Sequence, residues 1–284
     1  MLTTVTTIAD LRARLHAARA AGKTVGFVPT MGYLHAGHAS LMAAAREGTD
    51  LVVASIFVNP LQFGPNEDLG AYPRDLDGDT ALAEGQGVDL LFVPSGDEMY
   101  PDGAVRSSIT VAEVSEPLEG KARPTHFAGV ATVVAKLFAI VGPCTAYFGE
   151  KDFQQVAVVR QMVRDLSIPV DVVACPTLRE ADGLAMSSRN AYLTPEERAA
   201  APVVHATLQA GRMAIDAGER DPARVRSLMA DLINAEPLAQ LDYAEVVDAR
   251  TLQVVDPLAG ELRLLAAVRF GKARLIDNLG ARIP

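Results

Sequence analysis

The stretch VGFVPTMGYLHAGH, residues 25–38, joins a short apolar run to a turn with two glycines and then to a helical pattern. Residues 25–28 predict a buried strand that ends at Pro29, and we expect the helix to begin near His38. A turn from a strand into a helix brings backbone N–H groups and the positive end of the helix to one place, and its glycines let a ligand approach the backbone. The stretch therefore predicts a phosphate-binding turn.

Two histidines three residues apart, His35 and His38, lie in this turn. Imidazole N–H groups can donate hydrogen bonds to phosphate oxygens without a fixed cation. The alternative is that one histidine caps the helix and the other is satisfied locally. Because the pair stands at a strand-to-helix junction, we favour phosphate binding. The turn matches neither the Walker pattern nor the GxGxxG pattern.

Short β-branched runs alternate with helical patterns over the first part of the chain. Further strands are predicted at residues 51–58, 89–93, 145–148 and 170–175, and helices at residues 8–21, 38–48, 75–85 and 130–141. Near-continuous apolar strands between helices are typical of a parallel sheet that is covered on both faces. We therefore expect an α/β fold with a doubly wound parallel sheet, whose ligand lies at the carboxyl ends of the strands.

The pattern changes after residue 184. Thr194-Pro195-Glu196-Glu197 is typical of a helix start, with a threonine cap, a proline in the first turn and acidic side chains near the positive helix end. Helical patterns reach residue 217 and span residues 222–235, and strands are predicted at residues 242–247 and 262–270. We predict two domains, residues 1–184 and a smaller C-terminal α+β domain of residues 185–284.

Composition limits the function classes. The 284 residues are 49% hydrophobic and carry a net charge of −9, which disfavours a nucleic-acid partner. The two cysteines, Cys144 and Cys175, have no metal-binding spacing and do not indicate a disulfide framework. We therefore expect a reducing, cytoplasmic location. No signal-peptide pattern opens the chain, and the longest apolar stretch, residues 130–141, contains Lys136 and is too short to cross a bilayer.

Other candidate binding residues follow the predicted strands. Uncharged amides in NPLQFG, residues 59–64, suit hydroxyl and carboxylate groups, although asparagine and proline are also common in turns. In FGEKDFQQ, residues 148–155, Lys151 offers a point charge for phosphate and Asp152 an acceptor for ribose hydroxyls. Two hydroxyls and an arginine, Ser187, Ser188 and Arg189, offer several donors to a polyphosphate.

Two further groups of residues leave their role open. The acidic residues Asp68, Asp75, Asp77 and Asp79 could hold Mg²⁺ through water or simply form a solvated helix face. Arg123 and His126 precede the predicted helix at residues 130–141, and the sequence does not decide whether they reach the binding site.

The segments PTMGYLHAGH, FVNPLQFGPNED, YPRD, RPTHFAGV, YFGEKDFQQ and READGLAMSSRN together resemble the pantoate–β-alanine ligase (pantothenate synthetase) family of the HxGH nucleotidyl-transferase superfamily. The likeness covers almost the whole chain, including DYAEVVDARTL and RLIDN. It implies a Rossmann-like domain with a smaller C-terminal lid domain, and a homodimer. It also implies ATP-dependent condensation of (R)-pantoate with β-alanine through a pantoyl adenylate, with Mg²⁺ bound as Mg-ATP.

The resemblance also implies roles for single residues. His38 is the proton donor, with His35 and Lys151 as the other catalytic residues. The ATP-binding positions are Met31, Gly32, Tyr33, Leu34, His35, Ala36, Gly37, His38, Gly149, Glu150, Lys151, Asp152, Leu178, Met186, Ser187, Ser188 and Arg189. Gln62 and Gln155 hold pantoate, Gln62 also contacts β-alanine, and Asp79 lies near Mg²⁺. One departure is Cys144, which stands where the family more often has aspartate.

Three other classes of protein share parts of this pattern. A phosphopantetheine- or nicotinate-type adenylyltransferase would share the histidine turn, but such enzymes are usually shorter and lack the FVNPLQFG and GEKDFQQ segments. An aminoacyl-tRNA synthetase relative would carry a lysine where Ala185 stands, and the net charge does not suit tRNA. A non-enzymatic nucleotide sensor need not keep the paired amides together with MSSR, residues 186–189.

Overall fold

A computed structural model describes residues 1–64, 69–103 and 105–284, so Asp68 lies outside the described residues. The chain forms two compact units. The first comprises Met1–Glu150 and Gln155–Pro176, and the second comprises Lys151–Gln154 and Thr177–Pro284. The division predicted after residue 184 differs from this one, because residues 177–184 and the short segment Lys151–Gln154 lie with the C-terminal unit.

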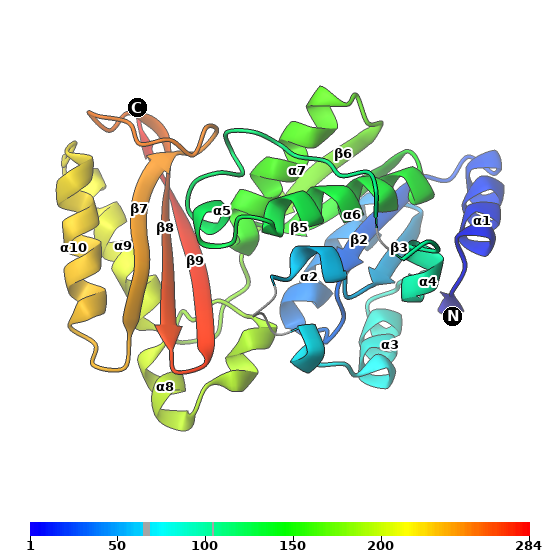
Figure 1. Cartoon of the computed structure of the whole chain (residues 1–284), viewed down its shortest axis with the longest axis horizontal. Coiled ribbons are helices and arrows are strands. Elements are labelled where there is room, and N and C mark those ends of the chain that lie inside the picture. The colour runs from blue at the N-terminus through cyan, green and yellow to red at the C-terminus, as the bar shows by residue number, and fades with distance from the viewer. Residues whose placement is uncertain (65–68, 104) are drawn as a thin grey trace. The chain divides into compact units, whose positions relative to one another are not determined.

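The first unit contains a six-stranded parallel sheet with the strand order β1-β4-β3-β2-β5-β6 (Figure 1). Its strands are β1 (Thr3–Val5), β2 (Val25–Thr30), β3 (Leu51–Ile56), β4 (Leu90–Phe92), β5 (Cys144–Gly149) and β6 (Val170–Cys175). Its helices are α1 (Ile8–Ala20), α2 (Ala36–Gly48), α3 (Leu76–Gly85), α4 (Gly96–Met99), α5 (Glu119–Ala122), α6 (His126–Val141) and α7 (Phe153–Asp165), the last of which starts in the second unit. The predicted doubly wound α/β fold is confirmed.

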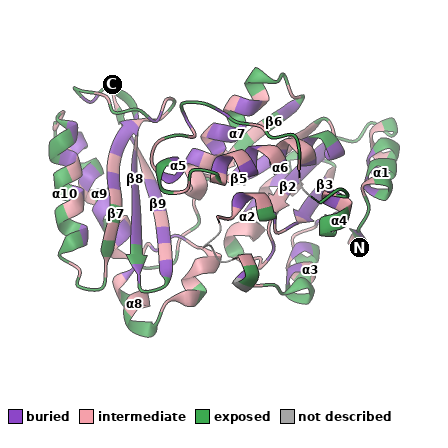
Figure 2. Cartoon of the chain, in the orientation of Figure 1, coloured by how far each residue is buried: buried purple, intermediate pink, exposed green. Residues whose placement is uncertain are grey.

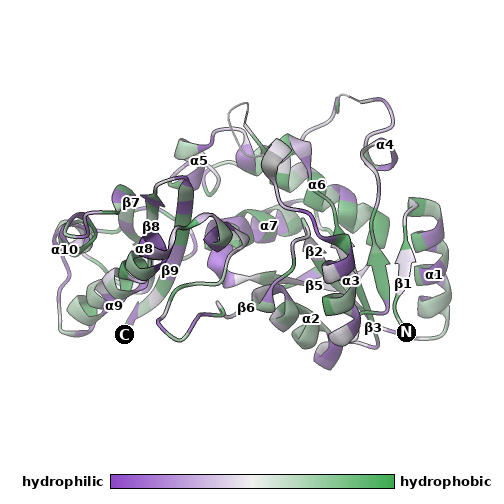
Figure 3. Cartoon of the chain, turned by 90° about the horizontal axis from the view of Figure 1, so that it is seen from below, coloured by the Kyte–Doolittle hydropathy of each residue, from purple (hydrophilic) through white to green (hydrophobic). Residues whose placement is uncertain are grey.

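Helices cover both faces of this sheet. Successive strand residues point to opposite faces, and both Phe27 and Val28 of β2 are completely buried. Val28 belongs to a core cluster with Leu41 and Met42 of α2. Phe27 packs edge-on against Phe138 of α6, with ring centroids 6.4 Å apart. Because both faces are buried, these strands read as continuous apolar runs, and β3 and α6 are largely hydrophobic in Figure 3.

The second unit is an α+β structure. Its antiparallel sheet has the order β7-β8-β9, with β7 at Gln240–Asp248, β8 at Gly260–Phe270 and β9 at Ala273–Ile283. Helices α8 (Pro195–Ala200), α9 (Val203–Asp216) and α10 (Pro222–Asn234) accompany it. Leu208, Met229 and Leu264 are fully buried together where α9, α10 and β8 meet, and much of β8 is buried (Figure 2).

Several elements differ from the sequence predictions. β1, β9 and α7 were not predicted, and the helix expected from residue 194 to 217 is two helices, α8 and α9. β9 lacks a clean apolar pattern because it carries the polar residues Asp277 and Asn278 at buried positions. It is a strand because it pairs with β8 from Gly260↔Ile283 to Phe270↔Ala273. Among the described residues, none of the helices combines the length and apolar character needed to cross a membrane.

Candidate active site

The histidine turn follows β2 and caps α2. The helix begins at Ala36, two residues earlier than predicted, because His35 is its N-cap. The Nδ1 atom of His35 accepts a hydrogen bond from the Gly37 N–H at 3.1 Å. The Nδ1 atom of His38 accepts from the His35 N–H at 3.3 Å, which completes a reciprocal capping box. Both histidines therefore satisfy backbone donors at the start of the helix.

This capping arrangement fixes the tautomer of both rings. A neutral imidazole whose Nδ1 accepts a hydrogen bond carries its proton on Nε2. His35 and His38, whose ring centroids lie 4.2 Å apart, are therefore both Nε2–H donors in the neutral form. Helix capping and phosphate binding use different nitrogen atoms of the same rings, so the two functions considered from the sequence are compatible.

Asp79 of α3 holds the backbone of the turn. Its Oδ2 accepts from the Tyr33 N–H at 2.9 Å and its Oδ1 from the Leu34 N–H at 2.5 Å. The side chain is buried, and burial raises the pKa of this carboxyl while the bonds from Leu34 and Tyr33 oppose that rise. Gly32 has φ +84°, and a Cβ there would lie 2.9 Å from Asp79 Oδ2, so the tight turn requires glycine.

The turn lies at the point where the strand order reverses. β2 pairs with β3 on one side and with β5 on the other, while β3 leads outward to β4 and β5 leads outward to β6. Ligands of open α/β sheets bind at such a switch point, beyond the carboxyl ends of the strands. β5 ends there at Gly149, where an added Cβ would meet no described atom within 4 Å. Packing therefore does not require glycine at position 149.

Gln62 and Asn59 are buried, and a series of polar contacts that reaches Tyr100 holds the Gln62 amide. It ends the short 3-10 helix η1 (Pro60–Gln62), and its Nε2 lies 2.9 Å from the Met31 sulfur. Its Oε1 accepts from Asn59 Nδ2 at 3.3 Å. The Asn59 Oδ1 in turn accepts from the Tyr100 hydroxyl at 2.8 Å, and burial raises the pKa of Tyr100 to about 12, so this hydroxyl keeps its proton. This series of contacts sets which way the Gln62 amide faces.

Arg123 and His126 reach this part of the site. The guanidinium Nη2 of Arg123 donates to the Gln62 carbonyl oxygen at 3.3 Å, and His126 Nδ1 lies 2.9 Å from the same oxygen. The sequence left their location open, and the structure brings them to the backbone of a predicted pantoate-binding residue. Gln155, the other such residue, is half-buried in the first turn of α7, and the hydrogen bonds of the described residues do not join it to Gln62.

The segment after β5 passes from one unit into the other. Gly149 and Glu150 belong to the first unit, and Lys151 and Asp152 to the second. The Lys151 side chain is 17% exposed, and its Nζ lies 3.3 Å from Asp152 Oδ1. A largely buried ammonium group beside one carboxylate can still approach an anionic ligand.

The predicted polyphosphate-binding residues of the second unit follow a hairpin. Arg179 pairs with Ala185, and the Met186 N–H donates to the Leu178 carbonyl at 3.0 Å. Ser187 caps the 3-10 helix η4 (Ser188–Tyr192), and its Oγ accepts from the Arg189 N–H at 3.3 Å. The structure thus places Leu178 beside the Ser187–Arg189 turn within one unit.

The described residues hold no cluster of three or more histidine, cysteine, aspartate or glutamate side chains that suits a metal ion. Both carboxylate oxygens of Asp79, the predicted metal residue, accept hydrogen bonds from the histidine turn. Mg²⁺ in nucleotide sites is usually bound by one or two carboxylates together with substrate phosphates. The chain's residues therefore fit Mg²⁺ that arrives with a nucleotide better than a separate protein cage.

Sequence reasoning missed several residues that support the site. Tyr100 contacts Asn59, Asp277 contacts Arg179 and Asn278 contacts the Lys151 carbonyl, each across a long stretch of the chain, and Arg263 in turn contacts Asn278. The only sequence signal was the match of RLIDN, residues 274–278, to the family pattern, which assigned no role.

Comparison with known proteins finds a family model and relatives that belong to one family. A family model described as pantoate-beta-alanine ligase matches residues 3–280. The chain is 58% identical over 258 residues to the pantothenate synthetase of Heliobacterium modesticaldum, covering 91% of this chain and 92% of that protein. It is 54% identical over 276 residues to the pantothenate synthetase of Herpetosiphon aurantiacus, covering 97% and 98%.

Solved structures agree with these relatives. Pantothenate synthetase from Thermus thermophilus matches with a TM-score of 0.92 at 50% identity, covering 98% of this chain and 99% of that one. Pantoate-beta-alanine ligase from Francisella tularensis, solved in complex with beta-gamma ATP and beta-alanine, matches with a TM-score of 0.81 at 35% identity, covering 98% and 97%. The chain belongs to the pantoate–β-alanine ligase family.

Proposed function

We propose that this chain condenses (R)-pantoate with β-alanine at the expense of ATP, giving pantothenate, AMP and pyrophosphate. The pantoate carboxylate attacks the α-phosphate of ATP and forms a pantoyl adenylate. The β-alanine amine then attacks the acyl carbon and releases AMP. Activation is needed because a free carboxylate is a poor acyl donor, whereas a mixed anhydride is a good one.

The observation that carries the proposal is the histidine turn at the switch point of the sheet. Its two Nε2–H donors stand at the start of α2, and the Asp79 carboxylate fixes the turn backbone. Charge that develops on the phosphoryl oxygens during adenylate formation is stabilised by donors already in place. We assign His38 and His35 to this stabilisation, with His38 as the proton donor.

We assign the remaining binding roles by segment. Met31–His38 and Gly149–Asp152 bind ATP, with Lys151 on phosphate and Asp152 and Gly149 on the adenosine part. Leu178 gives adenine a backbone contact, and Met186, Ser187, Ser188 and Arg189 bind the β- and γ-phosphates. Gln62 and Gln155 hold pantoate, and Gln62 also contacts β-alanine. The ordered amide of Gln62 supports its part in this assignment.

Mg²⁺ accompanies ATP in this proposal and neutralises phosphate charge when bound. The contacts of Asp79 support a role in shaping the histidine turn, so we place this residue near the Mg-ATP phosphates rather than as a dedicated ligand. We also propose a cytoplasmic homodimer. The two cysteines, Cys144 and Cys175, are both free thiols, which suits a reducing compartment.

The test is an assay of ATP with pantoate, with and without β-alanine. Purified protein should release pyrophosphate in a burst of about one equivalent when β-alanine is absent, and form pantothenate and AMP when it is present. Other hydroxy acids and other amines should support much slower turnover. No pantoate-dependent pyrophosphate release would overturn the ligase assignment and leave a nucleotide-binding protein without this chemistry.

A further inference from the structure

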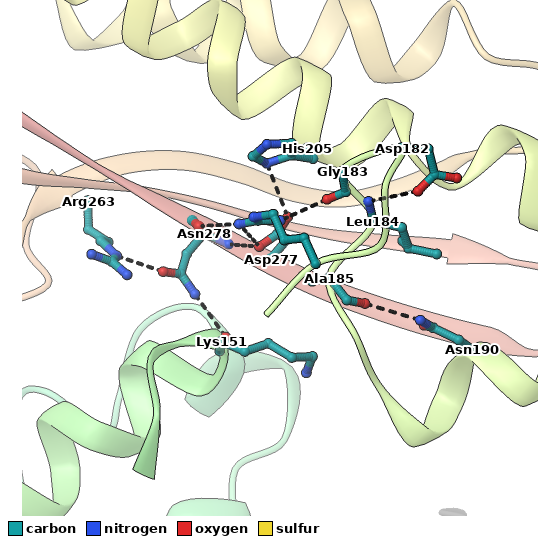
Figure 4. A network of polar contacts seen from close by, with 11 residues as sticks. Lys151, Asp182, Gly183, Leu184, Ala185, Asn190, His205, Arg263, Asp277 and Asn278 are labelled. Carbon is teal, nitrogen blue, oxygen red and sulfur yellow. Dashed lines mark hydrogen bonds and ion pairs between the residues drawn. The ribbon is translucent and has the colours of Figure 1, made fainter. Parts of the chain in front are cut away.

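Two adjacent polar residues of β9, Asp277 and Asn278, are buried in the second unit, with exposed fractions of 5% and 3%. Burying polar groups is costly unless each finds a partner, so their contacts show what the strand holds in place. Figure 4 shows that both lie within one network that also contains Lys151 and the loop of Gly183 and Ala185.

Asn278 holds the segment that contains Lys151. Its Nδ2 donates to the Lys151 carbonyl oxygen at 2.8 Å, and its Oδ1 accepts from Arg263 Nε at 2.6 Å (Figure 4). The bond from Arg263 orients the amide, because it fixes which end of Asn278 is the acceptor. The Arg263 guanidinium also lies 4.1 Å from the centre of the Phe153 ring, two residues after Lys151. Asn278 and Arg263 together therefore fix the backbone that carries the lysine.

Asp277 holds the hairpin that leads to the Ser187–Arg189 turn. Its carboxylate accepts both arms of the Arg179 guanidinium, at 2.6 and 3.0 Å. The same guanidinium donates to the Gly183 carbonyl at 3.1 Å. A bidentate pair of this kind fixes direction as well as distance. Because Arg179 pairs with Ala185, just before Met186, Asp277 sets the position from which the turn starts.

The two residues are neighbours on one strand, so the spacing between their partners is set by the backbone of β9. The backbone N–H of Asn278 also donates to Asp277 Oδ1 at 2.7 Å, which holds the Asp277 carboxylate against the backbone of β9. We propose that Asp277 and Asn278 are positioning residues that hold Lys151 and the Ser187–Arg189 turn in one fixed arrangement for binding a polyphosphate. This inference rests on the proposed function, which assigns both segments to the phosphates of ATP.

The test uses Asn278→Asp in the full chain. Aspartate keeps the size of the side chain and an acceptor for Arg263, but it places a carboxylate oxygen against the Lys151 carbonyl oxygen. We expect pantoate-dependent exchange of pyrophosphate into ATP to fall by about 10- to 100-fold, since small misplacements of a binding group cost rates of this order. The KM for ATP should rise while the KM for pantoate stays the same. Arg282→Gln, which removes an exposed ion pair with Glu261 at the end of the same strand, is the matched control and should exchange normally.

A combined variant separates positioning from general support of the fold. If Asn278 acts through Lys151, Asn278→Asp should cause little further loss when Lys151 is already alanine, because residues that act as a unit are not additive. An equal loss in both backgrounds, or no loss in the single variant, would overturn the inference. If Asn278→Asp does not fold, Asp277→Asn provides a second test of the proposal. That variant removes one acceptor for Arg179 and should also raise the KM for ATP, and a KM equal to that of the unaltered chain would contradict the proposal.

The unaltered chain distinguishes this inference from the proposed function. No pantoate-dependent exchange in the unaltered chain would defeat the proposed function itself. Normal exchange in the unaltered chain together with normal exchange in Asn278→Asp would defeat only the positioning role.

Discussion

His38 combines two tasks on one ring: its Nδ1 accepts the His35 N–H, and its Nε2 carries the proton that can reach a phosphate oxygen. His38→Gln should separate the tasks, because glutamine at this helix position accepts the same backbone N–H but lacks the imidazole donor. We expect kcat to fall by about 10²- to 10³-fold, as when one donor to a developing oxyanion is removed. Thermal melting should stay close to that of the unaltered chain.

His38→Ala is the companion variant, because it removes both the acceptor for the His35 N–H, which is one half of the capping box, and the imidazole donor. It should lose as much activity as His38→Gln and also lose about 1 kcal/mol of stability, a typical effect of losing a capping interaction. Turnover near the unaltered rate in either variant would remove His38 from the chemistry.

Substitution of Asp79 tests whether its carboxylate shapes the histidine turn or binds Mg²⁺. Asparagine at this position can accept one of the two N–H groups of Tyr33 and Leu34 but presents its own N–H to the other. Leaving a buried donor unsatisfied costs about 1–3 kcal/mol, so Asp79→Asn should reduce kcat/KM for ATP by roughly 5- to 150-fold. Raising the Mg²⁺ concentration should not restore it. Asp77→Asn, at an exposed position of the same helix, is the control. Recovery at high Mg²⁺ would instead favour metal binding.

At the level of elements, substitution by alanine should destabilise the chain at one glycine, Gly129, and leave its stability unchanged at another, Gly149. Gly129 of α6 packs against η1, and a Cβ there would collide with the Leu61 carbonyl oxygen and lie 2.7 Å from Gln62 Cα. Gly129→Ala should therefore destabilise the first unit by about 1–3 kcal/mol and raise the KM for pantoate, because η1 carries Gln62.

Gly149→Ala is the matched comparison. Nothing described lies within 4 Å of the added methyl, so the melting temperature should not fall. If the nucleotide approaches the backbone at the end of β5, the KM for ATP should rise. An unchanged KM for ATP would mean that the ligand does not pass close to Gly149.

Elements with a regular apolar pattern could be predicted from the sequence, whereas elements that mix polar and apolar residues could not. β3 is an apolar run whose middle residues are buried in a parallel sheet, and its predicted position agrees closely with the structure. β9 was missed because it is a strand through its pairing with β8, and α7 because its opening residues looked like binding residues rather than a helix. A local sequence pattern indicates which residues are buried, but it does not indicate which other segment a strand will pair with.

At the scale of a whole unit, His205 should give the second unit a pH-dependent stability. Burial, with the nearby Arg179 charge, lowers the pKa of His205 from 6.5, against the attraction of Asp277. Its Nδ1 lies 3.7 Å from Asp277 Oδ2, too far for a hydrogen bond. His205 therefore binds a proton more readily in the unfolded chain than in the folded chain. The contribution of the neutral His205 to the free energy of unfolding is complete above about pH 6.5 and is lost as the pH falls through the lower pKa of the folded state.

The measurement is the urea unfolding free energy between pH 7.5 and 5. It should fall below about pH 6.5 in the unaltered chain, and less steeply in His205→Gln, which cannot titrate in this range. Equal slopes for the two proteins would show that other groups set the acid sensitivity.

The sequence by itself determined the fold class, the family and the strand-to-helix turn that carries the two histidines, because these depend on residue type and spacing along the chain. Only the tertiary structure decided what holds the site residues in place. Asp79 reaches the turn from α3, Tyr100 and Asn59 orient Gln62, and β9 holds Lys151. The contacts made by Asp79, Tyr100 and β9 join segments far apart in the chain, whereas Asn59 lies three residues from Gln62. Hydrogen bonding depends on distance and direction in space, which no local pattern specifies.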